Sequence, residues 1–418
     1  MTNDVIITPD ATADTLADLY RDLHANPELS YAEVRTARVV ADSLTALGYQ
    51  VHAGLGRTGV AGVLTRGEGP TVLVRADMDG LPVTEATNLP YASTARGTDP
   101  DGNDVGVMHA CRHDVHVTCL LGAAQQLAAD DSWSGTLIML GQPAEEVGTG
   151  ATAMVADGLY DKVGTPDVVL GQHVGPMPTG MLALHAGPAY ATSDSMTITL
   201  YGRGGHGSRP EACIDPVVMA AAVVLRLQTI VSREVAGGDT AVVTVGTLRA
   251  GTKVNIIPDT AELQVNVRTF DDKVRNRVLA SIERIVRAEA AASGAEREPT
   301  IAHTDHFPLL YNDPDGCART IPVLAGVVGG PQRVIDPGPV TGSEDVGELA
   351  KAVGVPCVYW ILGGADPALF AGAATAEDML GVMATIPSNH SSGYAPVIEP
   401  TLGIGVAALV AAAKEWLG

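Results

Sequence analysis

The first part of the chain alternates between helix-like and strand-like hydrophobic spacing. Apolar positions recur every three or four residues from Thr12 to Leu47, which predicts two helices that end before Gly48. Four apolar runs typical of buried strands follow at 59–65, 71–79, 135–143 and 166–174. Segments with helical spacing separate them at 117–130 and 150–159. This alternation predicts an α/β fold, with a mainly parallel sheet flanked by helices.

The pattern changes after residue 187. Alternating apolar and polar positions at 193–202 precede a helical segment at 215–234. Two further alternating segments, a second helical segment and a last short strand follow at 240–251, 260–270, 274–293 and 298–305. The order β-α-β-β-α-β predicts an inserted α+β domain of the ferredoxin-like type. We therefore predict one domain in two parts, residues 1–187 and 304–418, interrupted by an inserted domain over residues 188–303.

Composition and charge narrow the class of protein. The 418 residues, 46% hydrophobic and 18% charged, are typical of a globular protein with two domains. With 48 acidic against 26 basic residues, the net charge of −22 argues against nucleic acid or an anionic membrane as partner. The five cysteines follow no disulfide framework, which favours a reducing compartment. Because we find neither a secretory signal nor an uninterrupted apolar run of membrane-spanning length, we expect a cytoplasmic protein.

Polar side chains follow three of the predicted strands directly. Asp77 and Asp79 end one strand, Glu145 and Glu146 follow another, and His173 ends a third. Because the carboxyl ends of parallel strands meet at one edge of a sheet, these groups are expected to converge there. Adjacent glutamates in extended chain point in opposite directions, so one could bind a metal while the other faces its water. A carboxylate beside a metal-activated water can take the water's proton, which indicates hydrolysis.

A denser cluster, "MHACRHDVH", covers residues 108–116. Cys111 and His113 are two residues apart, a spacing that places both side chains on one side of an extended chain. We therefore expect them to act from a loop or a strand end. Thiolate, imidazole and carboxylate together suit Zn²⁺, and with more oxygen ligands Mn²⁺.

Each signal also has a more ordinary interpretation. Cys119 fits a buried core position, and Cys111 considered alone would too. A pair of glutamates is usually solvated surface, and "GRGGHG" at 202–207 is more often a turn than a ligand site. Cys111 and His113 could also form a nucleophilic pair, although neighbours two residues apart rarely reach the required geometry.

Considered together, the motifs resemble those of the M20 metallopeptidase family. The resemblance lies with its amidohydrolase branch of hippurate hydrolases, N-acyl-amino-acid aminoacylases and auxin-conjugate hydrolases. The matching blocks follow the family's order over nearly the whole chain: "RDLHANPELSYAEVRT", "RADMDGLPVTE", "MHACRHDVHVTCLLGAA", "QPAEEVGTGATAMVADGL", "GQHVGPMPTG", "GRGGHGSRPEACIDPV", "LQTIVSRE", "GTKVNIIPD", "VRTF", "GSEDV" and "NHSS". This resemblance implies a zinc-peptidase-like catalytic domain with an inserted dimerisation or lid domain.

The resemblance also implies a two-metal site. The implied ligands are Cys111, His113, Glu146, His173 and His390. The expected ions are Zn²⁺ or Mn²⁺, with Co²⁺ and Ni²⁺ as alternatives. Glu145 would be the general base, and Asp77 and Asp79 would be active-site acids that orient ligands or tune the metal.

Residues of the inserted domain are implied to bind the substrate. His206 corresponds to a histidine that reaches a neighbouring active site across a homodimer and stabilises the oxyanion. Asn255 and Arg268 correspond to polar groups suited to the substrate's carboxylate, which an arginine fork binds well. The expected activity is therefore metal-dependent hydrolysis of the amide bond in small N-acyl amino acids.

Two residues depart from the family pattern. Arg112 stands where the family carries glycine, and Val346 stands where it carries an aromatic residue. If the backbone at Arg112 is left-handed, the side chain costs about 1–2 kcal/mol. Its guanidinium is expected to point into solvent or to pair with a carboxylate such as Asp114.

Two other functions remain open beside the active amidohydrolase. Arg112 could alter the substrate pocket by adding a cation, or it could weaken the metal site, which would leave a non-catalytic binding or regulatory relative. A dipeptidase or carbamoylase of the same superfamily would carry the same motifs. An active enzyme is the favoured interpretation, because all five implied ligands and Glu145 are present.

Overall fold

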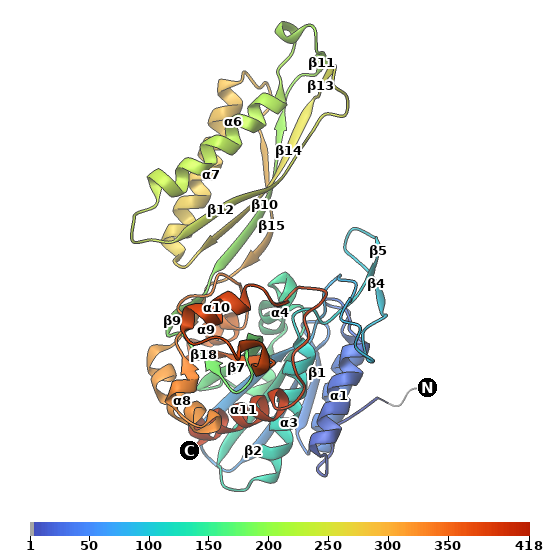
Figure 1. Ribbon diagram of the computed structural model, residues 1–418, viewed down its shortest axis with the longest axis vertical. Helices are drawn as coiled ribbons and strands as arrows, with labels where there is room; N and C mark the ends of the chain where they lie inside the picture. Colours follow the sequence, from blue (N-terminus) through green and yellow to red (C-terminus); the bar gives the residue numbers. More distant parts are fainter. Residues whose placement is uncertain (1–3) are drawn as a thin grey trace. The chain divides into compact units, whose positions relative to one another are not determined.

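The computed structural model describes residues 4–418, which form two compact units (Figure 1). Unit 1 contains the chain up to Ala189, together with Tyr311–Gly338 and Asp345–Gly418. Unit 2 contains Tyr190–Leu310 and Pro339–Glu344. Each unit has its own hydrophobic core.

Unit 1 is built on an eight-stranded sheet. Its strands, in spatial order, are β1 (Gln50–Leu55), β2 (Gly59–Arg66), β6 (Gly135–Gln142), β3 (Thr71–Asp77), β7 (Val168–Pro178), β18 (Cys357–Ala365), β8 (Leu182–Ala183) and β17 (Val334–Ile335). The central strands β6, β3, β7 and β18 are parallel, whereas β1 and β2 are antiparallel to their neighbours. The predicted mainly parallel sheet is confirmed.

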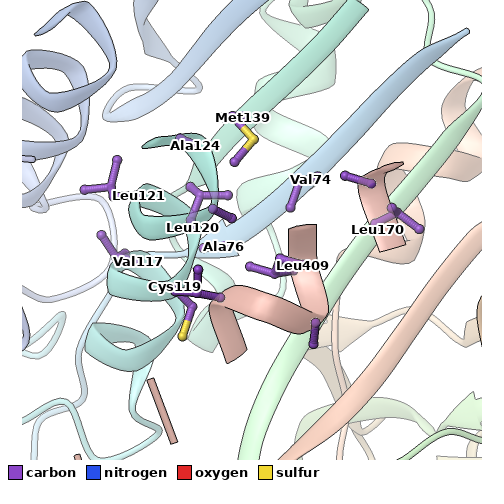
Figure 2. Close-up of a cluster of buried hydrophobic side chains, with 14 of the residues drawn as sticks. Val74, Ala76, Val117, Cys119, Leu120, Leu121, Ala124, Met139, Leu170 and Leu409 are labelled. Atoms are coloured by element: carbon purple, nitrogen blue, oxygen red, sulfur yellow. The ribbon is translucent and has the colours of Figure 1, made fainter. Parts of the chain in front are cut away.

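Helices flank this sheet. They are α1 (Ala13–Ala25), α2 (Val34–Ala46), α3 (His113–Ala129), α4 (Gly150–Ala156), α5 (Leu159–Val163), α8 (Pro314–Val328), α9 (Gly347–Val353), α10 (Ala376–Met383) and α11 (Thr401–Leu417). Figure 2 shows Leu120 on the side of α3 that faces Val74 of β3 and Leu409 of α11, while Val117 and Leu121 lie on the opposite side of the helix. Cys119 of α3 is fully buried, and burial raises the pKa of its thiol, as expected for a core cysteine.

The strands β3, β6 and β7 have almost entirely buried side chains. A strand covered on both faces has few polar positions until it leaves the core, so its polar residues gather at its end. Asp77 is the last residue of β3, and the turn carrying Glu145 and Glu146 follows β6. His173 lies within β7 rather than at its end, because β7 continues to Pro178.

Unit 2 is an antiparallel sheet with two helices. Its elements, in chain order, are β10 (Thr192–Tyr201), β11 (Gly205–His206), α6 (Pro216–Thr229), β12 (Ala241–Ala250), β13 (Ile256–Ile257), β14 (Thr260–Thr269), α7 (Asp272–Ala292) and β15 (Thr300–Phe307). The four long strands lie in the order β12-β14-β10-β15, while β11 and β13 form a separate ribbon. Alternate residues of β10 and β14 share one core with α6 and α7. The predicted ferredoxin-like arrangement is confirmed.

The structure also contains short elements that hydrophobic spacing did not predict. They include β4 (Arg96–Thr98), β5 (Asp104–Gly106), β9 (Gly187–Tyr190) and β16 (Leu310–Asn312), and the longer β1 and α8 were not predicted either. Strands of two to four residues contain too few positions for a period to be recognised.

One helical segment, Pro216–Glu234, is long and apolar enough to cross a membrane by length and composition alone. Arg226, Gln228 and Thr229 interrupt its apolar residues, so the expectation of no uninterrupted apolar run of this length is not contradicted. Met219, Val223 and Leu227 of this segment are fully buried in the core of unit 2. A core helix passes the same test, so the segment is weak evidence for a membrane span.

Asp194 is a buried charge in unit 2. It is 1% exposed, and Arg275 donates to both of its oxygens, from Nε at 2.7 Å and from Nη2 at 2.5 Å. The ring nitrogen Nδ1 of His306 lies 3.0 Å away. Burial opposes ionisation, but the hydrogen bonds from His306 and Arg275 outweigh it and lower the pKa of Asp194.

We predict that Asp194→Asn lowers the free energy of unfolding by roughly 2 kcal/mol at pH 7, because Arg275 loses its carboxylate partner. The folded-state pKa lies below the unfolded value of about 3.9, so this stabilisation is complete above that value and is lost as the pH falls through the folded-state pKa. Chemical denaturation at pH 7 and pH 3 measures both effects, with the exposed Asp239→Asn as control. An equal difference at both pH values would contradict the prediction.

Candidate metal centre

Cys111 and His113 lie where the chain turns into α3. Arg112 between them has φ 70° and ψ 36°, a left-handed conformation, and His113 is the first residue of the helix. Cys111 belongs to the preceding turn. The two side chains therefore share one site through a left-handed turn and a helix start, and the expected extended spacing was wrong.

Cys111 meets side chains from three other segments. Its Sγ lies 3.3 Å from Nε2 of His173 on β7. Nε2 of His390 lies 3.4 Å from Oε2 of Glu146. Three possible ligand atoms lie within 4.8 Å of one another, one from each of Cys111, Glu146 and His390. These three side chains form the first possible cation site.

His113 is the centre of a second group. One ligand atom each from Asp77, His113, His116 and His173 lie within 4.8 Å of one another. Nε2 of His113 is also 3.8 Å from a carboxylate oxygen of each residue of the glutamate pair. All five expected ligands thus belong to overlapping groups, which offer two adjacent positions for cations.

The electrostatics of this cluster favour positive charge. Burial alone would lower the pKa of His113, but Asp77, Asp79 and Glu146 outweigh it and raise the pKa to about 10. Burial and the charges of Asp79 and Asp77 raise the pKa of Glu146 to about 8, although His113 opposes the shift. Carboxylates packed this closely in a buried site are stabilised by a bound cation.

His173 is prepared to act as a ligand. Burial and the neighbouring His116 hold the pKa of His173 well below its ordinary value. The imidazole is therefore neutral, which is the form that binds a metal. Its Nδ1 lies 2.9 Å from the carbonyl oxygen of Val174, so Nδ1 carries the proton and Nε2 is the lone-pair nitrogen.

Asp77 and Asp79 contact the imidazoles of the cluster. Oδ1 of Asp79 lies 3.1 Å from Nδ1 of His113, and Oδ1 of Asp77 lies 2.5 Å from Nδ1 of His116. Asp77 also accepts a hydrogen bond of 2.8 Å from Nη1 of Arg75. Carboxylates in this position fix the orientation of an imidazole and direct its other nitrogen into the site.

The glutamate pair lies on a tight turn. Ala144 has φ 52°, Glu145–Val147 form a 3-10 turn, and Gly148 has φ 65°. The pair is therefore not in extended chain, and the prediction that adjacent side chains diverge for that reason was wrong. Glu145 is nevertheless 5% exposed and has its Oε2 3.8 Å from Nε2 of His113.

The donor atoms fit divalent metal ions. Nε2 of His113 and Oε1 of Glu146 are buried, and neither has a hydrogen-bond partner in the part of the chain that the structure describes. A set of one thiolate, three imidazoles and a carboxylate, with further carboxylates beside it, suits Zn²⁺ or Mn²⁺. The residues present are thus suited to the metal centre that the sequence predicted.

The side chain of Arg112 is fully buried, so of its two expected orientations the one toward solvent was wrong. Its Nη1 lies 2.8 Å from Nδ1 of His24 and 4.0 Å from Oδ2 of Asp114. The guanidinium also lies over the ring of Tyr394, 5.4 Å from its centroid. The other expected orientation, an ion pair between Arg112 and Asp114, is present with a long separation of 4.0 Å.

His24 explains how the buried arginine is accommodated. Its two ring nitrogens lie 2.6 Å from Asp114 and 2.9 Å from Glu85, and all of these side chains are inaccessible to solvent. Burial and Arg112 lower the pKa of His24, but the two carboxylates outweigh them and raise it. The negative charge of Asp114 and Glu85 therefore favours positive charge on His24 and Arg112. We refer to Arg112, His24, Asp114 and Glu85 as the arginine cluster.

The substrate residues predicted in the inserted domain belong to unit 2. His206 ends β11, Asn255 is exposed just before β13, and Arg268 lies on β14. Their roles toward the cluster in unit 1 remain predictions.

Several residues near the cluster had not been given a role from sequence. Nδ2 of Asn389 donates to the carbonyl oxygens of Cys111 at 3.2 Å and Val174 at 3.0 Å, which joins three ligand-bearing segments. His24 and Glu33 lie in the block "RDLHANPELSYAEVRT". The similarity of that block was recognised, but hydrophobic spacing gives no sign of what its polar residues contact.

A helix-flanked sheet carrying buried thiol, imidazole and carboxylate groups, with a second α+β unit inserted, defines a metallohydrolase of the peptidase type. Residues 73–379 match the family model "Peptidase family M20/M25/M40". The chain belongs to this family, in its amidohydrolase branch, as the motifs indicated.

Three similar proteins illustrate the relationship. Hippurate hydrolase of Campylobacter jejuni is 39% identical over 347 residues, covering 81% of this chain and 85% of that protein. Thermostable carboxypeptidase 2 of Saccharolobus solfataricus is 36% identical over 357 residues, covering 84% and 86%. The structure of Bacillus subtilis YXEP, a dinuclear metal-binding peptidase of the M20 family, aligns with a TM-score of 0.72 at 26% identity, covering 97% and 99%.

We predict that Arg112→Gly is more stable than Arg112→Ala by about 1 kcal/mol. Both variants remove the guanidinium, but only alanine keeps a Cβ in the left-handed conformation. Chemical denaturation measures the difference. Elemental analysis should find wild-type metal content in both, because the contacts of Arg112 are with His24 and Asp114 rather than with expected ligands.

The same pair of substitutions at Arg226 is the matched control. Arg226 is exposed within α6, where alanine should be more stable than glycine. Equal stability of Arg112→Gly and Arg112→Ala would contradict the left-handed geometry. A large gain of metal in Arg112→Gly would show that the arginine weakens the centre.

Proposed function

We propose that this metallo-amidohydrolase cleaves the amide bond of N-acyl amino acids. The observation that supports it most is the convergence of the buried Cys111 and His113 with Glu146, His173 and His390, with the buried Glu145 beside them. The hippurate hydrolase relative supports the substrate class, because hippurate is itself an N-acyl amino acid.

The five ligands would hold two divalent ions, which would polarise the amide carbonyl and lower the pKa of a water molecule. The carboxylate of Glu145 lies 3.8 Å from Nε2 of His113, and Glu145 is not one of the five expected metal ligands. It would accept the proton of the attacking water and deliver it to the leaving amine. Asp77 and Asp79 would hold the imidazoles of His116 and His113 in place throughout.

His206 has the tautomer that oxyanion stabilisation requires. Its Nδ1 accepts a hydrogen bond of 3.1 Å from the backbone N–H of Ser208, so in the neutral ring Nε2 carries the proton. An N–H donor of this kind stabilises the negative oxygen of a tetrahedral intermediate. The proposal places His206 in the active site of a partner subunit, in a homodimer formed through the inserted domain.

Arg268 is held as a carboxylate receptor would be. Its Nη1 donates to the carbonyl oxygen of Thr341 at 2.6 Å and to Oγ of Ser343 at 3.2 Å, within unit 2. These contacts fix the guanidinium plane, so that its remaining N–H groups can bind the α-carboxylate of the substrate. Asn255 would donate a further hydrogen bond to the same group.

The carboxypeptidase relative favours a second candidate substrate. A C-terminal peptide bond has the same amide and the same free carboxylate, so the two-metal centre and Arg268 would serve it equally. We propose that the enzyme uses Zn²⁺ or Mn²⁺ and acts in the cytoplasm. Neither nucleic acid nor a membrane is expected as a partner.

We expect protein reconstituted with Zn²⁺ or Mn²⁺ to bind two ions per chain and to hydrolyse hippurate or N-acetyl amino acids. Glu145→Gln should lower kcat by roughly 10²–10⁴-fold, because the base is lost while its shape is kept. Elemental analysis should find its metal content unchanged. The exposed Glu68→Gln is the control. Less than one metal per chain with no turnover would instead favour a non-catalytic binding protein.

The role of Arg268 can be tested with paired substrates. Wild-type kcat/KM should be roughly 10–100-fold higher for an N-acetyl amino acid than for its C-terminal amide, because a charge-assisted hydrogen bond is lost with the carboxylate. In Arg268→Ala this preference should largely disappear. The exposed Arg249→Ala should keep it. An undiminished preference in Arg268→Ala would assign the carboxylate to another residue.

A further inference from the structure

The turn that carries Glu145 has a strained beginning. Ala144 has φ 52° and ψ 39°, although it is not a glycine. A left-handed residue with a Cβ costs on the order of 1–2 kcal/mol, so neighbouring contacts must hold it. The orientation of Glu145 depends on this residue, because Ala144 sets the direction in which the chain leaves Pro143.

Two buried carboxylates hold the backbone on both sides of Glu145. Oε1 of Glu33 accepts a hydrogen bond of 2.8 Å from the backbone N–H of Ala144. Oδ2 of Asp79 accepts one of 3.0 Å from the backbone N–H of Glu146. Glu33 is fully buried and Asp79 is 1% exposed. Glu145 therefore lies between two backbone groups that are each fixed by a carboxylate.

Both contacts depend on one short segment of the chain, Ser30–Glu33. Ser30 donates from Oγ to Oδ2 of Asp79 at 2.7 Å, and the hydroxyl of Tyr31 lies 2.7 Å from Oγ1 of Thr149 at the far end of the turn. With Glu33, three of these four residues support the turn, either directly or through Asp79. We refer to residues 30–33 as the clamp segment.

Glu33 does not serve the helix that it precedes. It is the N-cap residue of α2, but its side chain makes no capping hydrogen bond. Its second oxygen accepts a hydrogen bond of 2.6 Å from Oγ1 of Thr58. Burial, together with the charge of Asp79, raises the pKa of Glu33 to about 7. A carboxyl group is costly to bury unless it is hydrogen-bonded. The hydrogen bond from Ala144 helps to offset that cost for Glu33.

We propose that Glu33 is a positioning residue for Glu145: by holding the left-handed turn at Ala144, it directs the base toward the attacking water. This inference rests on the proposed role of Glu145. Glu33 touches neither the expected ligands nor the reacting atoms in our assignment. Its effect should therefore appear in the chemical step and not in metal binding.

Two substitutions separate the hydrogen bond from the charge. Glutamine can keep both contacts, because its Oε1 accepts from Ala144 while its Nε2 donates to Oγ1 of Thr58. Alanine removes both. In metal-loaded enzyme assayed with hippurate or an N-acetyl amino acid, Glu33→Ala should lower kcat by roughly 10–100-fold, the usual range for residues that orient an active site. KM and metal content should change little, and Glu33→Gln should stay within about threefold of wild type.

Glu28→Ala is the matched control for a loss of stability. The Glu28 carboxylate lies five residues earlier and accepts hydrogen bonds from the backbone N–H groups of Arg35 and Thr36, so its loss also disturbs the entry to α2. Within residues 4–418, its side chain forms no hydrogen bond with the turn at 143–150. Glu28→Ala should lower the thermal midpoint without lowering kcat. Wild-type kcat in Glu33→Ala, or an equal loss in Glu33→Gln, would overturn the proposal.

A double-mutant cycle separates this inference from the proposed function. If Glu33 acts through Glu145, Glu33→Ala should cause little further loss of kcat in a Glu145→Gln background. Full multiplication of the two losses would overturn the positioning role while leaving Glu145 as the base. A Glu145→Gln variant with wild-type kcat would instead show that the base assignment has failed, and the positioning role would fail with it.

Discussion

The structure of the site depends on the concentration of buried negative charge beside the central strands of a parallel sheet. Asp77, Asp79 and Glu146 lie close enough to raise the pKa of the buried His113 to about 10. A folded protein can keep such charges out of water only if cations or donated hydrogen bonds compensate them. The imidazoles of His113 and His116, which contact Asp79 and Asp77, and the backbone N–H of Glu146 supply part of this compensation.

Backbone strain accompanies the same site. Left-handed residues other than glycine occur at Arg112 between two expected ligands, at Ala144 before the glutamate pair, and at His390 itself. Two of these turns are held by distant segments: the backbone N–H of His390 donates to the carbonyl of Ala110, and the backbone N–H of Ala144 donates to Glu33. Strain of this kind persists where surrounding contacts fix the geometry, as in sites that must hold ligands within narrow limits.

Hydrophobic spacing was sufficient to predict both folded units, because the buried strands and the two long helices of unit 2 have clear periods. It also placed Asp77 and the glutamate pair at strand ends. It could not predict that a left-handed turn joins Cys111 to His113, since a backbone dihedral is not visible in residue spacing. Contacts between distant segments, such as Asn389 with Cys111 and Glu33 with Ala144, were inaccessible for the same reason.

Arg112 shows how one substitution can be accommodated without exposing it to solvent. The position requires a left-handed backbone, which explains why glycine suits it, and the long side chain must then be buried. His24 lies between Asp114 and Glu85, and these two carboxylates raise its pKa. The guanidinium lies 4.0 Å from Asp114 and adds a positive charge beside these carboxylates. Because these contacts lie beside the metal centre and not within it, the arginine is compatible with an active enzyme.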